Sequence, residues 1–149
     1  MRVVLQRVKR ASVEVDGYII GKIENGILVF LGIKQNDTTE DLNYIVDKIA
    51  NIRIFEDQAG KMNLSLQEIN GEILIISQFT LYGDARGGRR PSYIEAARPE
   101  EAIPLYEKCI LELKNKGIKV ETGEFGADMQ VELINDGPVT ILLDSKKTF

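Results

Sequence analysis

Three segments carry side chains whose types and spacing could do chemistry. The first is Ser77-Gln78-Phe79-Thr80-Leu81, in which hydroxyl groups and a carboxamide follow an apolar run typical of a strand. Polar groups at the end of a rigid strand, beside a glycine-rich loop, are well placed to bind and orient a ligand. The alternative is that Ser77 and Thr80 only satisfy backbone groups at the strand end, and composition alone favours that alternative.

The second segment, residues 86–93, places three guanidinium groups in a loop with two glycines. Arg86, Arg89 and Arg90 are suited to binding phosphate, and Tyr93 could stack on a nucleobase. A solvated loop without a ligand is the ordinary alternative. Other basic residues that could meet a nucleic acid are Arg2, Arg7, Lys9, Arg10, Lys146 and Lys147.

The third segment is Asn135-Asp136-Gly137-Pro138-Val139-Thr140. Its composition predicts a turn that connects two strands, and a hairpin without further role is the simplest interpretation. A cis peptide is found at about 5–6% of X–Pro bonds in folded proteins. A cis Gly137–Pro138 bond could hold two backbone carbonyls pointing the same way into a site.

The chain has no histidine and one cysteine, Cys109. A Ser-His-Asp or Cys-His catalytic centre and any histidine-ligated or cysteine-rich metal site are therefore excluded. We predict no metal and no cofactor, since no phosphate-binding glycine motif or calcium-binding carboxylate cluster occurs either. Cys109 lies in an apolar stretch without an activating neighbour, so we expect it to pack in the core.

Hydrophobic periodicity indicates the elements that position these segments. Thr38 is expected to cap a helix with apolar positions at Leu42, Ile45, Val46 and Ile49. Pro99 suits the first turn of a second helix that Gly117 ends. A short helical piece is expected near 94–97. Strands are predicted at 2–8, 11–16, 18–23, 27–33, 52–55, 72–79, 118–121, 128–134 and 139–143.

These elements predict one α+β domain over residues 1–149, with a curved, barrel-like, mostly antiparallel sheet and two main helices packed on one face. Lys plus Arg is 19 and Asp plus Glu is 23, for a net charge of −4. Such a chain is not expected to coat nucleic acid generally, because that requires many phosphate-neutralising cations. Neither a signal peptide nor a membrane-spanning apolar run is apparent, so we expect a cytoplasmic protein without a membrane partner.

Taken together, these segments make the chain similar to the D-aminoacyl-tRNA deacylases of the DTD family. The resemblance covers nearly the whole length, and its most specific parts are the motifs at 77–81 and 135–140, in the same order. Tyr93 is a mild departure, since the family more often has Phe there. Matching flanks include Gln6-Arg7-Val8, Arg53-Ile54-Phe55, Arg90-Pro91-Ser92 and Phe125-Gly126-Ala127.

The resemblance implies a DTD-like fold and a homodimer with both active sites at the subunit interface. It implies that Ser77, Gln78, Phe79 and Thr80 line a pocket for the aminoacylated 3′-terminal adenosine of tRNA. Met129 would pack near that adenosine.

It further implies that the Gly137–Pro138 peptide is cis and reaches the partner's active site. There its carbonyls would sort substrates by chirality, and Arg7 would help to hold the segment in place.

Without histidine, hydrolysis of the ester needs another source of nucleophile. Thr80 could attack directly, although a hydroxyl without an adjacent base is a poor nucleophile. Alternatively, the 2′-OH of the RNA helps to activate a water, and backbone N–H groups near Phe79 and Thr80 stabilise the oxyanion. We favour the second route, with Thr80 and Gln78 as positioning groups, and leave the first open.

A rigid backbone wall excludes an L side chain by collision and need not grip a D side chain. We therefore expect hydrolysis of D-aminoacyl-tRNA, broad tolerance of D side chains and rejection of L-aminoacyl-tRNA. Glycine has no side chain to collide, so glycine mischarged on tRNA-Ala is also an expected substrate. Two other functions stay open: hydrolysis of another small ester or amide, and a non-catalytic dimeric module that binds RNA 3′ ends through its arginine loop.

Overall fold

Strand β1 (Arg2–Val15) organises the sheet in the computed structural model, which describes residues 1–149. One edge of β1 pairs antiparallel with β8 (Gln130–Asp144) along nearly its whole length. The other edge is shared by β3 (Gly26–Gly32), which pairs with residues 2–8, and β2 (Tyr18–Ile23), which pairs with residues 11–15. The two strands predicted at 2–8 and 11–16 are thus one strand, because β8 pairs with both halves.

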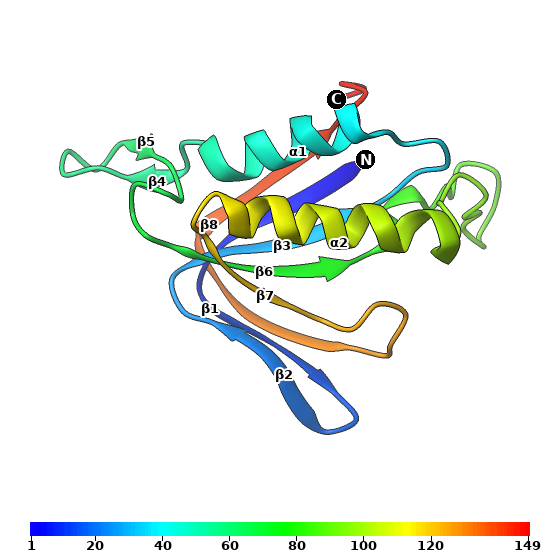
Figure 1. The fold of residues 1–149 in the computed structure, drawn as a ribbon, viewed down its shortest axis with the longest axis horizontal. Coiled ribbons are helices and arrows are strands. Elements are labelled where there is room, and N and C mark those ends of the chain that lie inside the picture. Colours follow the sequence, from blue (N-terminus) through cyan, green and yellow to red (C-terminus); the bar gives the residue numbers. More distant parts are fainter.

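Strands β3, β6 (Glu72–Ser77) and β7 (Lys119–Thr122) run parallel to one another in that order. Parallel neighbours need a crossover connection, and these connections contain helices α1 (Thr39–Asn51) and α2 (Pro99–Asn115). Both crossovers step in the same direction, so right-handed connections place both helices on one face of the sheet. Figure 1 shows this arrangement, and the predicted α+β class with a curved sheet and two helices on one face is confirmed.

The start of helix α1 agrees with the sequence prediction. The Thr38 hydroxyl accepts a hydrogen bond from the Asp41 N–H, and the Asp41 carboxylate accepts one from the Thr38 N–H. This reciprocal pair satisfies N–H groups that have no partner inside the helix. The predicted apolar positions, Leu42, Ile45, Val46 and Ile49, are buried.

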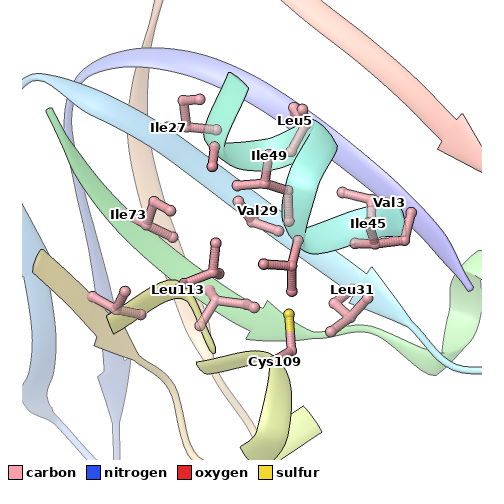
Figure 2. Packing of buried hydrophobic residues seen from close by; sticks show 14 of the residues in the cluster. Val3, Leu5, Ile27, Val29, Leu31, Ile45, Ile49, Ile73, Cys109 and Leu113 are labelled. Carbon is pink, nitrogen blue, oxygen red and sulfur yellow. The ribbon is translucent and has the colours of Figure 1, made fainter. Parts of the chain in front are cut away.

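The main core lies between the two helices and the sheet, and Figure 2 shows part of it. Cys109 of α2 is fully buried there, and its sulfur faces aliphatic side chains. Burial raises the pKa of the Cys109 thiol to about 12, so the thiol stays protonated and unreactive at neutral pH. The predicted packing role of Cys109 is confirmed.

A smaller apolar cluster fills the inside of the curved sheet, where β2 turns back over β6 and β7. Gly21 of β2 allows this close approach, because a Cβ atom there would lie 2.7 Å from the Thr122 carbonyl oxygen. The sheet therefore comes close to closing into a barrel. The cluster consists of Val8, Ala11, Val13, Ile23, Leu28, Leu74 and Ile76.

Three local predictions are wrong. The strand expected at 52–55 is reduced to β4 (Phe55–Glu56), which pairs only with β5 (Met62–Leu64). The helical piece expected at 94–97 is a turn followed by an isolated bridge to Lys34. The hairpin expected at 135–138 is a bulge within β8, because the segments on both sides pair with the same strand, β1.

Helix α1 is tied to the last residues of the chain through Asp41, whose carboxylate lies 2.8 Å from Lys146 Nζ. Burial raises the pKa of Asp41, but hydrogen bonds from Lys146, Ser145 and Thr38 outweigh it and hold that pKa well below its usual range. The ionised carboxylate therefore stabilises the folded protein above the ordinary Asp pKa of about 4, and this stabilisation is lost as the pH falls toward the folded-state value.

Replacing Lys146 with Met should weaken this pH dependence. We expect a lower melting temperature at neutral pH and a shallower loss of stability between about pH 5 and pH 2 than in the unaltered chain. Thermal unfolding followed by circular dichroism across that range measures both effects. Lys114→Met, at an exposed lysine of α2 without an ion pair, is the matched control. Superimposable profiles for Lys146→Met and the unaltered chain would contradict this account of Asp41.

Candidate functional site

A cleft of about 290 Å³ opens where β6 ends and the 3-10 turn η1 (Phe79–Tyr82) begins. Its polar lining comes from Ser77, Gln78 and Thr80, and Phe79 adds a ring that is 56% exposed. The cleft thus brings four of the five residues of the first motif together with Met129. The remaining wall is Leu31, Ile33, Ile76, Ala97, Ala102, Phe125, Gly126, Ala127 and Val131.

The parallel strands explain why these segments meet. The cleft is lined by residues at or just beyond the carboxyl ends of β3, β6 and β7, namely 31–33, 76–80 and 125–127. Because carboxyl ends of parallel strands lie at the same edge of a sheet, segments distant in sequence converge there, which is the usual place for ligand sites in parallel sheets.

The turn that carries Thr80 is fixed to strand β3. The Gln78 N–H donates to the Leu31 carbonyl at 2.8 Å, and the Gln78 carbonyl accepts from the Leu81 N–H at 3.2 Å. Gly32 lets the turn lie against the strand, since a Cβ there would be 3.0 Å from both the Gln78 carbonyl oxygen and Leu81 Cβ. The Thr80 side chain is therefore positioned by a rigid backbone.

The chemistry available in the cleft is that of uncharged polar groups. Gln78 Nε2 donates to Thr80 Oγ1 at 2.5 Å, which leaves the hydroxyl proton free to be donated to a ligand. A carboxamide cannot remove a proton from the hydroxyl, and no acidic or basic side chain lines the cleft. This chain alone can therefore orient and polarise a ligand in the cleft, but it supplies no general base there.

Tyr93 lies outside this cleft, in an adjoining groove of about 450 Å³. The Phe79 and Tyr93 rings meet edge to face, with centroids 5.1 Å apart and planes at 73°. Phe79 lines both hollows, and so do Ala97, Phe125 and Gly126. The groove and the cleft therefore adjoin each other and share part of their lining.

The arginine loop lies outside the cleft, and its three guanidinium groups differ. Two backbone hydrogen bonds between Asp84 and Ser92 close the loop. Arg86 donates to both carboxylate oxygens of Asp84, at 2.9 and 2.7 Å, and this holds the pKa of Asp84 well below its usual range. Arg89 and Arg90 are exposed and make no hydrogen bond or ion pair through their side chains, so their charges are available to a ligand.

The third motif forms the bulge in β8, which is held by Arg7. The buried Arg7 guanidinium donates to the carbonyls of Asp136 at 3.1 Å and of Ile54 at 2.7 Å. The Gly137–Pro138 peptide is cis, and Gly137 has φ +123°. L side chains rarely adopt this φ, and a Cβ at Gly137 would also lie 2.8 Å from Arg7 Nη2, so the position favours glycine.

The bulge and the cleft do not meet within one chain. Arg7, Gly137 and Pro138 do not line the cleft, and Gly137 and Pro138 are exposed. Arg7 lines a separate polar hollow with Asp136 and Phe55. The predicted site residues thus fall into four groups: the cleft, the adjoining groove with Tyr93, the arginine loop and the bulge.

Segment 125–127 supplies one wall of the cleft, a role that no motif in the sequence predicted. Gly126 has φ +78°, and Gly123 allows close packing, since a Cβ there would meet Met129 Sδ at 2.5 Å. The signal available was the pair of closely spaced glycines just before a strand, which indicates a backbone with special geometry.

No three or more His, Cys, Asp or Glu side chains lie close enough together to hold a metal ion. None of the helices has both the length and the apolar character needed to cross a membrane.

Comparison with known sequences gives concordant matches. Residues 4–144 match the model of a family described as D-Tyr-tRNA(Tyr) deacylase. A D-aminoacyl-tRNA deacylase of Thermosipho africanus (strain TCF52B) is 64% identical over 149 residues, which cover 100% of both chains. A D-aminoacyl-tRNA deacylase of Geobacillus sp. (strain WCH70) is 57% identical over 147 residues, which cover 99% of this chain and 97% of the relative.

Two solved structures are also similar. One described as c-Myc DNA Unwinding Element Binding Protein has a TM-score of 0.91 and 43% identity, covering 97% of this chain and 98% of its own. A probable eukaryotic D-amino acid tRNA deacylase has a TM-score of 0.83 and 19% identity, covering 96% of this chain and 98% of its own. At that identity the second likeness concerns the fold alone.

Arg7→Ala should destabilise the chain, because it leaves the carbonyls of Ile54 and Asp136 without their donor. We expect a loss of roughly 2–3 kcal/mol in the free energy of unfolding, as for hydrogen bonds to a charged group in a buried setting. Urea unfolding measures it. Arg10→Ala, at an exposed neighbour that makes no hydrogen bond or ion pair, should change stability by less than about 0.5 kcal/mol. Equal losses of stability in the two variants would contradict the conclusion that Arg7 supports the bulge.

Proposed function

The chain belongs to the D-Tyr-tRNA(Tyr) deacylase family, and we infer from this premise that it is a D-aminoacyl-tRNA deacylase. It is a hydrolase that acts on the ester bond between a D-aminoacyl group and tRNA. The observation that carries this conclusion is the family match over residues 4–144, together with full-length relatives at 57–64% identity. The substrate's position, the mechanism and the dimer are proposals built on it.

We propose that the cleft at η1 binds the aminoacylated 3′-terminal adenosine. An apolar wall that includes Phe79 and Met129 suits the faces of the base and ribose, and the three polar side chains suit the ester. Ser77, Gln78 and Thr80 orient the ester through hydrogen bonds. Arg89 and Arg90, which have no acidic partner, contact phosphates further along the RNA, and Arg86 does so only by giving up its pair with Asp84.

We propose that a water, rather than Thr80, attacks the ester. Thr80 accepts a hydrogen bond from Gln78, and a hydroxyl with such a neighbour is positioned without being deprotonated. The neighbouring 2′-OH of the RNA takes the proton of the water as its own proton passes on to the leaving 3′ oxygen. The bond between the acyl carbon and that oxygen breaks, which gives the free D-amino acid and tRNA with a 3′-OH.

The oxyanion of the tetrahedral intermediate needs donors, and the first N–H groups of η1, those of Phe79 and Thr80, are proposed to supply them. N–H groups in the first turn of a helix have no acceptor within that helix, and donors on a rigid backbone need no reorganisation during the reaction. An ester is already activated relative to an amide, so positioning and oxyanion stabilisation are enough for turnover without an ionisable catalytic side chain.

The chiral selection is proposed to come from the bulge of a second copy of the chain. Gly137 and Pro138 are exposed, are held from behind by Arg7 and lie outside their own cleft. A homodimer would bring them to the partner's cleft as a wall that an L side chain strikes and a D side chain or glycine avoids. The free edge of β8 and the exposed apolar side chains Ile134 and Leu142 support a covered surface here.

The substrate proposal predicts a definite order of rates on one tRNA charged with D-tyrosine, glycine or L-tyrosine. D-tyrosyl-tRNA and glycyl-tRNA, including glycine on tRNA-Ala, should be hydrolysed, and L-tyrosyl-tRNA should stay intact at the same enzyme concentration. Because tRNA is the substrate, the activity belongs in the cytoplasm. Release of the labelled amino acid measures the rates.

Three other results would contradict parts of this proposal. Cleavage of D-tyrosyl-tRNA with glycyl-tRNA left intact would contradict exclusion by a wall. Salt-sensitive binding without any release would favour an RNA-end-binding module. Equal efficiency on a free D-tyrosine ester would favour a general esterase.

A purified mixed dimer tests the shared site. One subunit carries Thr80→Val, which should lower turnover about tenfold or more through lost positioning. The other carries Pro138→Gly, which loosens the wall and should admit L-tyrosyl-tRNA. In the mixed dimer the active cleft faces an unaltered wall, so we expect the D-over-L preference of the unaltered enzyme. A preference equal to that of the Pro138→Gly homodimer would mean that the bulge does not act on the partner's cleft.

A further inference from the structure

The groove that adjoins the cleft has no part in the mechanism above. Its volume of about 450 Å³ exceeds that of the cleft, and it shares with the cleft the walls formed by Phe79, Ala97 and Phe125. The groove therefore lies directly beside the cleft, along these shared residues. Its own lining adds Tyr93, Ile94, Ala96, Arg98, Pro99 and Gln35.

The groove exposes aromatic and apolar side chains on which a nucleobase could stack. Phe79, Tyr93 and Ile94 are 56%, 40% and 78% exposed, so three large apolar side chains meet solvent within one depression. Exposed apolar patches of this kind mark binding surfaces. Planar aromatic side chains on such a surface are the usual partners of unpaired bases in single-stranded nucleic acid.

The cationic residue Arg98 lines the same groove as these aromatic side chains. Arg98 is exposed, precedes the first residue of α2 and makes no hydrogen bond or ion pair through its side chain. Arg86, by contrast, is occupied by Asp84. A free guanidinium next to an aromatic surface matches the two parts of a nucleotide, its phosphate and its base.

The groove is preformed. The Gln35 N–H donates to the Glu95 carbonyl at 3.0 Å, and the Gln35 carboxamide donates to the Ile94 carbonyl at 2.6 Å. The Ala97 N–H donates to the Ile33 carbonyl at 2.9 Å. Because these bonds hold segment 94–97 against the end of β3, a ligand would bind without the cost of ordering the groove.

We propose that this groove binds the nucleotide immediately 5′ of the terminal adenosine, with its base stacked on Tyr93 beside Phe79 and a neighbouring phosphate near Arg98. The proposal rests on the proposed function, which places the terminal adenosine in the cleft. The next nucleotide is joined to it by one phosphodiester, so a hollow with shared walls is within its reach. The other possible occupant is the D-aminoacyl side chain, which would pair with the guanidinium only when that side chain is acidic.

The experiment compares D-tyrosyl-tRNA carrying its normal penultimate cytidine with the same tRNA made abasic at that position. For the unaltered enzyme, loss of the base should raise KM about tenfold, as expected for one stacked base, with little change in kcat. Tyr93→Ala should raise KM on the normal substrate, and removal of the base should then add little, because both changes remove the same contact. Arg98→Ala should raise KM on both substrates alike and reduce the salt dependence of KM by about one phosphate contact.

Lys114→Ala, at an exposed lysine near the other end of α2, is the matched control and should respond to base removal as the unaltered enzyme does. Ile94→Ser, at a side chain that is 78% exposed, is a second variant that keeps the test open if Tyr93→Ala does not fold. It should reduce the effect of base removal on KM.

Several results would overturn the proposal. One is an unchanged KM for the unaltered enzyme after base removal. A second is losses from Tyr93→Ala and base removal that multiply fully, since Tyr93 would then act elsewhere. A third concerns Tyr93→Ala: its preference for D-tyrosyl over D-alanyl groups changes, while removal of the penultimate base still raises KM as in the unaltered enzyme. That result would assign the groove to the amino acid. Failure of the proposed function is distinguishable, because the normal D-tyrosyl-tRNA would then not be hydrolysed at all.

Discussion

The structure of the proposed site depends on the contact between the buried Arg7 and the bulge of β8. Arg7 is a charged side chain inside the sheet, and a buried guanidinium is stable only when its donors are paired. Its partners are the backbone carbonyls of Ile54 and Asp136 and the Asp136 carboxylate at 3.6 Å, and Asp136 lies where β8 bulges away from β1. The bulge is therefore held by a buried charge rather than by regular strand pairing, which makes an exposed backbone segment rigid.

A rigid backbone also positions the side chains that line the cleft. No acidic or basic side chain lines it, and the polar groups present are two hydroxyls and a carboxamide. A site of this kind works through shape, through fixed donors and through a substrate that brings an activated ester and its own 2′-OH. A site with few specific contacts suits a deacylase that must accept many D side chains, because selection by exclusion needs no contact with the accepted group.

The position of the cleft follows from the mixed sheet. Strand β1 is antiparallel to its neighbours, but β3, β6 and β7 are parallel, so their carboxyl ends converge and carry residues 31–33, 76–80 and 125–127 to one place. Both helices cover the same face as a consequence of the same crossovers. The turn η1 is hydrogen-bonded to the end of β3, and the ring of Phe79 in η1 contacts Tyr93, which places the groove beside the cleft.

The sequence by itself determined the elements whose signals are local. The Thr38 cap, the apolar positions of α1 and the start of α2 at Pro99 follow from hydrogen bonding and periodicity within a few residues. The first motif lies at the end of a buried strand, as its sequence predicted, and the absence of histidine by itself excludes a histidine-based mechanism.

Only the tertiary structure decided which strands pair and in which direction. The turn composition of residues 135–138 correctly indicated a departure from regular strand, but whether the chain reverses or bulges depends on β1, a strand about 130 residues away. The convergence of 125–127 with the first motif, and the separation of Tyr93 and Gly137 from the cleft, likewise depend on pairing partners. Side-chain types fix local propensity and the available chemistry, whereas the distances between chemical groups are set by long-range packing that no short segment encodes.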